Sequence, residues 1–128
     1  MAEGKAEVTI AREPADVWAL VGRFDGLDEW MPGVEACEMD GDVRKLQTMG
    51  MEIHERLVAR DEDARSISYS IAKSPMPLEH HLATISVTPD GDGSRLEWAY
   101  EVRPDEMAAA FGPVYEGSAA AIKAHLEG

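Results

Sequence analysis

A chain of 128 residues is long enough for one hydrophobic core and too short for two, so we expect a single domain over residues 1–128. Its 12 basic and 25 acidic residues give a formal net charge of −13, which argues against nucleic acid as a partner. The sequence has no apolar run of the roughly 20 residues that cross a membrane, so we expect no membrane insertion. It also opens without an apolar leader and has a single cysteine, Cys37, which favours a cytoplasmic location.

The first elements that the sequence predicts are one strand and two short helices. Apolar and polar residues alternate over Lys5–Ala11, as they do in a half-buried strand. Pro14 suits the first turn of a helix, and the apolar stripe that follows ends at Gly22. A further helical turn fits Leu27–Met31, because Pro32-Gly33 then ends it.

Six more strands are predicted between Val34 and Pro104, separated by turns rich in glycine, proline and aspartate. The clearest is Arg65–Lys73, in which serines alternate with larger apolar side chains. The apolar face of that strand consists of Ile67, Tyr69 and Ile71. Consecutive hairpins of this kind predict an antiparallel sheet.

The chain ends in a predicted long helix over Asp105–Leu126, rich in alanine and with apolar residues at helical spacing. Proline lacks a backbone donor, so we expect a kink or a broken first turn near Gly112-Pro113. The small side chains of Ser118–Ala121 are compatible with a weak homodimer, and a monomer is the alternative. The expected class is α+β, with the order β-α-α-β(six)-α.

This order and several short motifs resemble the START/Bet v 1-like (SRPBCC) superfamily, specifically its polyketide cyclase/dehydrase branch. The motifs are Glu13–Met31 leading into Pro32-Gly33-Val34, then Glu55-Arg56-Leu57, Tyr69-Ser70-Ile71 and Leu96-Glu97-Trp98. The resemblance implies a helix-grip fold, in which a seven-stranded antiparallel sheet wraps around the C-terminal helix and encloses an apolar cavity. It does not choose among the activities of the superfamily, because fold alone does not determine function.

If the sheet grips the helix, the inward side chains of the strands and of the helix form the wall of that cavity. A largely apolar wall with a few polar groups is typical of a small-molecule site. The alternative is an ordinary filled core. The predicted ligand-binding residues are Glu55, Leu57, Tyr69, Ile71, Met76, His81, Ala83, Ile85, Trp98, Tyr100, Met107, Phe111, Val114 and Tyr115.

Glu55 is the first candidate for a functional group. Its place in the strand puts a carboxyl group on the face of Ile53 and Leu57, where desolvation favours a proton-donating or ligand-binding role. The resemblance also implies a role for Glu55 in the pocket, since plant hormone receptors of the superfamily carry a pocket glutamate in the matching motif. The alternative is a glutamate that is turned to solvent or paired with an arginine.

His81 is the second candidate. His80 and His81 must point to opposite faces of a strand, and alternation with Ala83 turns His81 inward. A neutral imidazole near Glu55 could transfer protons in a cyclisation or dehydration, with Tyr69 or Tyr100 donating to a developing enolate oxygen. The alternative is a hydrogen-bonded core or rim histidine.

The sequence predicts neither a metal site nor a cofactor. The four histidines form no zinc-binding pattern, and no phosphate-binding loop or nucleophile elbow is present. Asp90–Gly93 has the composition of a hairpin turn rather than of a calcium loop.

Three functions remain open at this point. The first is binding of a hydrophobic or aromatic small molecule for carriage, sensing or sequestration. The second is a cofactor-independent polyketide cyclase, aromatase or dehydratase that uses Glu55 and His81 as acid and base, with Tyr69 assisting. The third is a protein-interaction module with a filled interior and an acidic outer face.

Overall fold

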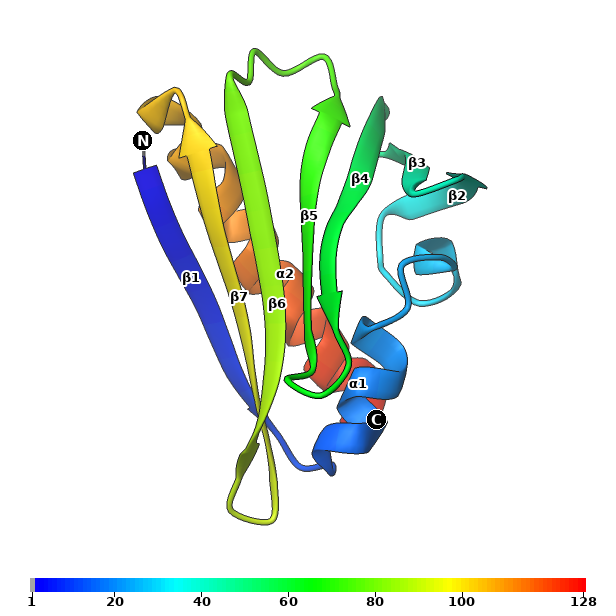
Figure 1. Ribbon diagram of the computed structural model, residues 1–128, viewed down its shortest axis with the longest axis vertical. Helices are drawn as coiled ribbons and strands as arrows, with labels where there is room; N and C mark the ends of the chain where they lie inside the picture. Colours follow the sequence, from blue (N-terminus) through cyan, green and yellow to red (C-terminus); the bar gives the residue numbers. More distant parts are fainter. Residues whose placement is uncertain (1) are drawn as a thin grey trace.

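Seven antiparallel strands form one sheet, and a long C-terminal helix lies across one of its faces in the computed structural model, which describes residues 2–128 (Figure 1). The order of the strands across the sheet is β1-β7-β6-β5-β4-β3-β2, so the first strand pairs with the last. The strands are β1 (Ala2–Ile10), β2 (Val34–Asp40), β3 (Val43–Thr48), β4 (Met51–Asp61), β5 (Ser66–Lys73), β6 (His80–Asp90) and β7 (Gly93–Arg103). The helix-grip fold expected from the sequence is confirmed.

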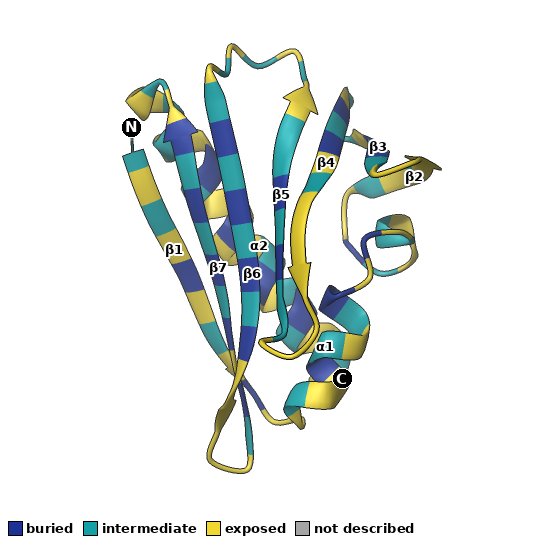
Figure 2. Ribbon diagram, in the orientation of Figure 1, coloured by how far each residue is buried: buried dark blue, intermediate teal, exposed yellow. Residues whose placement is uncertain are grey.

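The side chains of the central strands alternate between the core and the outer face. Figure 2 shows this alternation as successive bands along β6 and β7. Leu96, Trp98, Tyr100 and Val102 of β7 are buried, as the sequence pattern predicts. Full burial of an aliphatic side chain contributes about 1.5–3 kcal/mol, so this face supplies much of the stability of the fold.

Two helices and two short 3-10 turns complete the chain. They are α1 (Pro14–Val21), η1 (Leu27–Glu29), η2 (Asp105–Met107) and α2 (Ala108–Glu127). The predicted C-terminal helix therefore begins as a 3-10 turn, and α2 then continues through Pro113 without interruption. Because Pro113 lies only in the second turn of α2, the missing donor removes a single hydrogen bond near the start of the helix.

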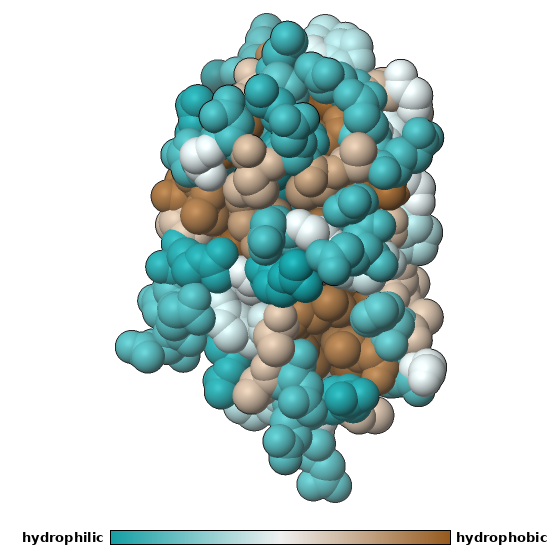
Figure 3. All heavy atoms as spheres, turned by 90° about the vertical axis from the view of Figure 1, so that its right-hand side faces the viewer, coloured by the Kyte–Doolittle hydropathy of each residue, from teal (hydrophilic) through white to brown (hydrophobic). Residues whose placement is uncertain are grey.

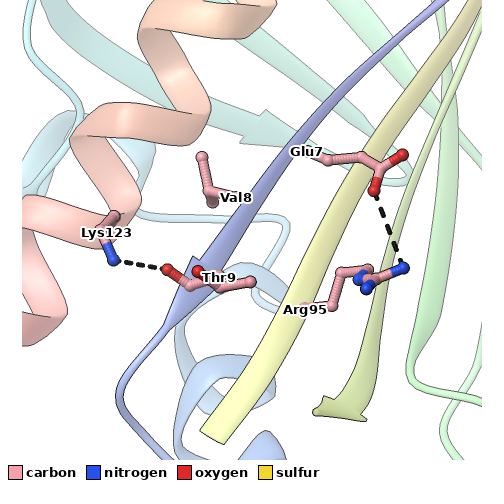
Figure 4. A pocket seen from close by; sticks show the side chains of 5 residues that line it. All are labelled: Glu7, Val8, Thr9, Arg95 and Lys123. Carbon is pink, nitrogen blue, oxygen red and sulfur yellow. Dashed lines mark hydrogen bonds and ion pairs between the residues drawn. The ribbon is translucent and has the colours of Figure 1, made fainter.

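The C-terminal end of α2 is fixed to the start of the chain. The ammonium group of Lys123 donates to the carbonyl oxygen of Thr9 on β1, an interaction visible in a shallow hollow beside the helix (Figure 4). Arg12 donates to the carbonyl oxygen of Leu126 at 2.7 Å, and the backbone N–H of Ala11 donates to the Glu127 carboxylate at 2.8 Å. The helix is thus held closest to β1 and β7, away from β3 and β4.

The small side chains of Ser118–Ala121 do not form an exposed face. Ala119 is buried in the core, and Ser118 and Ala121 line a cavity under the helix. Only Ala120 of this group points outward. The helix thus turns Ser118, Ala119 and Ala121 toward the sheet, and the choice between a monomer and a weak homodimer stays a prediction.

No helix within residues 2–128 has both the length and the hydropathy needed to cross a membrane.

Candidate ligand cavity

A cavity of about 570 Å³ lies between residues 110–121 of α2 and strands β3, β4 and β5, closed at one side by η1 and the loop that follows it. Most of its wall is apolar or aromatic, and Trp98 reaches it from β7. The space exists because α2 packs on β1 and β7, so the sheet on the other side has no helix directly against it.

Methionine and valine side chains surround the opening of this cavity. Met49 and Val114 line it, although 62% and 40% of these residues, respectively, are exposed. Met51 and Met76 also contribute to the wall. Figure 3 shows the side of the molecule that carries β2 and β3, where hydrophobic atoms reach the surface between hydrophilic groups. Because methionine side chains are flexible, such a rim can adapt to ligands of different shape.

Glu55 lies in the cavity wall and is paired with Arg44. The two residues face each other across the β3–β4 hairpin, and both are almost completely buried. The Nε–H of Arg44 donates to Oε1 of Glu55 at 2.7 Å, and Nη2 of Arg44 lies 2.7 Å from the same oxygen. No donor among residues 2–128 bonds the second oxygen, Oε2. Glu55 therefore matches the arginine-paired alternative, with one oxygen left as an acceptor.

Arg44 is held by further contacts behind the wall. Its Nη1 donates to the carbonyl oxygen of Phe24 at 3.1 Å. The guanidinium carbon lies 4.2 Å from the centre of the Phe24 ring and 5.0 Å from that of Tyr69. These contacts hold the arginine in place, so the position of the Glu55 carboxylate is fixed as well.

Tyr69 brings a hydroxyl group into the same region. The indole N–H of Trp98 donates to its oxygen at 3.1 Å. Burial, and secondarily the negative charge of Glu55, raises the pKa of Tyr69 well above its usual value. The hydroxyl is therefore protonated at neutral pH and serves as a hydrogen-bond donor or acceptor.

His81 points inward, as predicted, but it lies behind the cavity wall rather than in it. Its Nδ1 accepts the backbone N–H of Ile71 at 3.1 Å, so the ring proton resides on Nε2, which donates to the hydroxyl oxygen of Tyr115 at 2.7 Å. Burial, together with the nearby His80, lowers the pKa of His81 to about 4. His81 is thus a neutral, hydrogen-bonded core histidine, which is the alternative that the sequence left open.

The structure brings eight of the fourteen predicted ligand-binding residues to the cavity wall. These eight are Glu55, Tyr69, Ile71, Met76, Trp98, Phe111, Val114 and Tyr115. The other six face inward or lie partly buried, but not on this wall: Leu57, His81, Ala83, Ile85, Tyr100 and Met107.

His81 is held behind the wall by its hydrogen bonds to Ile71 and Tyr115, and the other five residues are displaced by packing or by their place along the chain. Ala83 and Ile85 lie on the central strand β6 and are buried in the hydrophobic core. Tyr100 packs against Tyr115, with ring centres 5.0 Å apart, and Met107 lies in η2 before the cavity begins. A register shift in β4 follows Leu57, which packs into the core instead.

Several wall residues were not anticipated from the sequence. From β3 and its turn they are Arg44, Leu46, Thr48 and Met49; from the η1 region, Leu27, Met31, Pro32, Gly33 and Val34; from α2, Ala110, Pro113, Gly117, Ser118 and Ala121. A signal for Arg44 was present, because a hairpin that turns at Met49-Gly50 pairs residue 44 with residue 55.

No group of three or more His, Cys, Asp or Glu side chains within residues 2–128 is arranged to hold a metal ion. The charged residues that line the cavity are Arg44 and Glu55, which bind each other. The arrangement offers a largely apolar space whose wall carries one carboxylate oxygen of Glu55 and the hydroxyl groups of Tyr69 and Tyr115, the latter bonded to His81.

A family model described as polyketide cyclase / dehydrase and lipid transport matches residues 1–127. Among solved structures, the protein XoxI from Bacillus cereus is 30% identical, with a TM-score of 0.91 over 98% of this chain and 96% of that chain. A START superfamily protein from Mycobacterium smegmatis is 18% identical, with a TM-score of 0.79 over 98% of this chain and 97% of that chain.

A third similar structure is the di-domain ARO/CYC BexL from the BE-7585A biosynthetic pathway. It is 17% identical, with a TM-score of 0.85 over 99% of this chain and 47% of that chain. This likeness is one of fold. The search of curated proteins gave no match.

Proposed function

The chain belongs to the polyketide cyclase / dehydrase and lipid transport family, and from this premise we propose that its cavity binds a hydrophobic or aromatic small molecule for carriage, sensing or sequestration. The observation that carries the proposal is the cavity of about 570 Å³ beneath α2, with apolar walls and a single buried ion pair. Ligand sites commonly span about 300–1,000 Å³ and combine apolar walls with a few placed polar groups.

The apolar wall supplies most of the binding free energy in this proposal. An aromatic ligand that removes about 200 Å² of apolar surface from water gains about 5 kcal/mol at about 25 cal/mol per Å². Part of that gain is offset by the lost motion of the ligand. Because a dissociation constant of 1 mM corresponds to about −4.1 kcal/mol, submillimolar to millimolar affinities are expected for simple aromatic compounds.

Binding of N-phenyl-1-naphthylamine, a neutral dye that fluoresces in apolar surroundings, tests the proposal. Wild-type protein is expected to enhance its fluorescence saturably. Ala121→Phe places a ring in the cavity and should weaken binding at least tenfold, because Ala121 lies on the wall. The matched control is Ala120→Phe, which adds the same ring on the outer side of α2. Equal binding by both variants, or no binding by the wild type, would contradict the proposal.

A cyclase-like activity is the second candidate. It is favoured by the free oxygen of Glu55 and by the hydroxyl of Tyr69, which line the same cavity. In this scheme Glu55 accepts a proton from a carbon next to a carbonyl group, and Tyr69 donates to the enolate oxygen. His81 has no direct part in it, because its nitrogens bond Ile71 and Tyr115.

Turnover of a poly-β-keto thioester tests this second candidate. Glu55→Gln should abolish turnover, whereas Glu52→Gln on the same strand should retain it, since the Glu52 side chain is exposed and bonds His54. Absence of turnover by the wild type, with dye binding intact, would leave binding as the function.

A further inference from the structure

The polar end of the cavity also restricts the chemical class of the ligand, an inference that rests on the proposed binding function. We propose that the ligand is uncharged and carries a hydroxyl or N–H group that donates to Oε2 of Glu55, and that the cavity discriminates against carboxylates such as fatty or aromatic acids.

The first step is that the wall offers an acceptor. Both contacts from Arg44 converge on Oε1 of Glu55, and Oε2 bonds no donor among residues 2–128. Glu55 is a cavity-lining residue, and no side-chain nitrogen or oxygen buried in the described chain lacks a hydrogen-bond partner. Oε2 is therefore accessible from the cavity. A ligand hydroxyl that reaches it makes a charge-assisted hydrogen bond, which is stronger than one between neutral groups.

The second step is that the wall offers no free cation. Among residues 2–128, Arg44 is the one basic residue on the cavity wall, and all three of its side-chain nitrogens are engaged. Nε and Nη2 contact Glu55, and Nη1 donates to the carbonyl oxygen of Phe24. A carboxylate ligand would therefore have no unpaired positive charge to bind.

The third step is that a carboxylate would be repelled. It would approach the Glu55 carboxylate inside a largely apolar space, where like charges interact more strongly than in water. It would also lose its own hydration without an opposite charge to replace it. The net charge of −13 on the whole chain adds to the repulsion of an anionic ligand.

Three ligands with one ring system separate these effects: naphthalene, 2-naphthol and 2-naphthoate, titrated at pH 7 against the full chain. The dissociation constants come from displacement of N-phenyl-1-naphthylamine. We expect 2-naphthol to bind about tenfold more tightly than naphthalene, and 2-naphthoate to bind at least tenfold more weakly than 2-naphthol.

Glu55→Gln should reverse the order of the affinities for 2-naphthol and 2-naphthoate. The substitution leaves Arg44 with an unpaired charge, so the affinity for 2-naphthoate should rise at least tenfold. The affinity for 2-naphthol should fall to that for naphthalene. Glu52→Gln is the matched control and should keep the wild-type order, because its side chain is exposed. If Glu55→Gln does not fold, as judged by circular dichroism, the double variant Arg44→Met with Glu55→Leu replaces it. That variant should bind naphthalene and 2-naphthol equally.

The outcomes distinguish the two proposals. If naphthalene binds but 2-naphthol binds no better, or if 2-naphthoate binds wild-type protein as well as 2-naphthol, the ligand class is wrong while the binding function stands. If none of the three ligands binds, the proposed function fails and this inference fails with it. An unchanged 2-naphthol preference in Glu55→Gln, or in the double variant, would also overturn the assignment to Glu55.

Discussion

The buried imidazole of His81 should make the protein less stable in mild acid. In the unfolded chain this group titrates near 6.5, whereas burial, reinforced by His80, lowers its folded pKa to about 4. Between these pH values the unfolded chain binds more protons than the folded one, so acid favours unfolding. The stability that neutral His81 contributes is fully present above pH 6.5 and is lost as the pH falls toward 4.

The size of this effect follows from the same two values. A fall in the pKa of His81 from 6.5 to about 4, at about 1.4 kcal/mol per pKa unit, corresponds to about 3 kcal/mol in the free energy of unfolding. His81→Gln removes the titrating group, while its amide can still accept from Ile71 and donate to Tyr115. The free energy of unfolding of the wild type should therefore decline by about 3 kcal/mol more than that of the variant between pH 7 and pH 4.

Urea unfolding followed by tryptophan fluorescence at half-unit pH steps measures this difference. The control is His125→Gln, a substitution of an exposed histidine whose ring lies 6.0 Å from that of Trp30. A plot of its free energy of unfolding against pH should run parallel to that of the wild type. If the His81→Gln curve is parallel to the wild-type curve as well, His81 is not buried as a neutral group and the reasoning is refuted.

Three further predictions concern stability. Trp98→Ala should cost about 3–5 kcal/mol in urea unfolding because it truncates a buried aromatic side chain, and a cost under about 1 kcal/mol would contradict its place in the core. Tyr115→Phe leaves the Nε2–H of His81 without its acceptor and should cost about 1–3 kcal/mol; an unchanged Tm would speak against that hydrogen bond. Gly50→Ala should destabilise the protein by about 1 kcal/mol, because Gly50 has a positive φ of 74° that alanine adopts only with strain. Gly117→Ala in α2 should instead stabilise the protein by about 0.5–1 kcal/mol, because the added methyl group meets nothing within 4 Å. Calorimetry showing the same sign for both glycines would refute this contrast.

The fold was predictable because its signals are local. Alternation over β5 and β7 identifies which side chains face the core, and turn residues identify where each hairpin ends. The same alternation correctly turned Glu55, Tyr69 and His81 inward. A period of two thus determines the face of a sheet on which a residue lies.

The position of a residue along that face was not predictable in the same way. Ala83 and Glu55 both face the inner side of the sheet, yet Ala83 is buried within the core and Glu55 lies on the cavity wall. That difference depends on the path of the helix, which long-range bonds such as that from Lys123 to Thr9 set. Pairing across a hairpin is an intermediate case, since the turn at Gly50 already implies that Arg44 lies opposite Glu55.

The most direct test of a ligand-binding cavity beneath α2 is a methyl NMR titration of protein labelled at the isoleucine δ1 positions. The chain has six isoleucines, of which Ile53 and Ile71 line the cavity. The other four, Ile10, Ile67, Ile85 and Ile122, are buried in the core. Saturation with 2-naphthol should give nuclear Overhauser contacts from the ligand to the methyl groups of Ile53 and Ile71 alone. Contacts to Ile10 or Ile122, or none to either cavity methyl, would contradict the account.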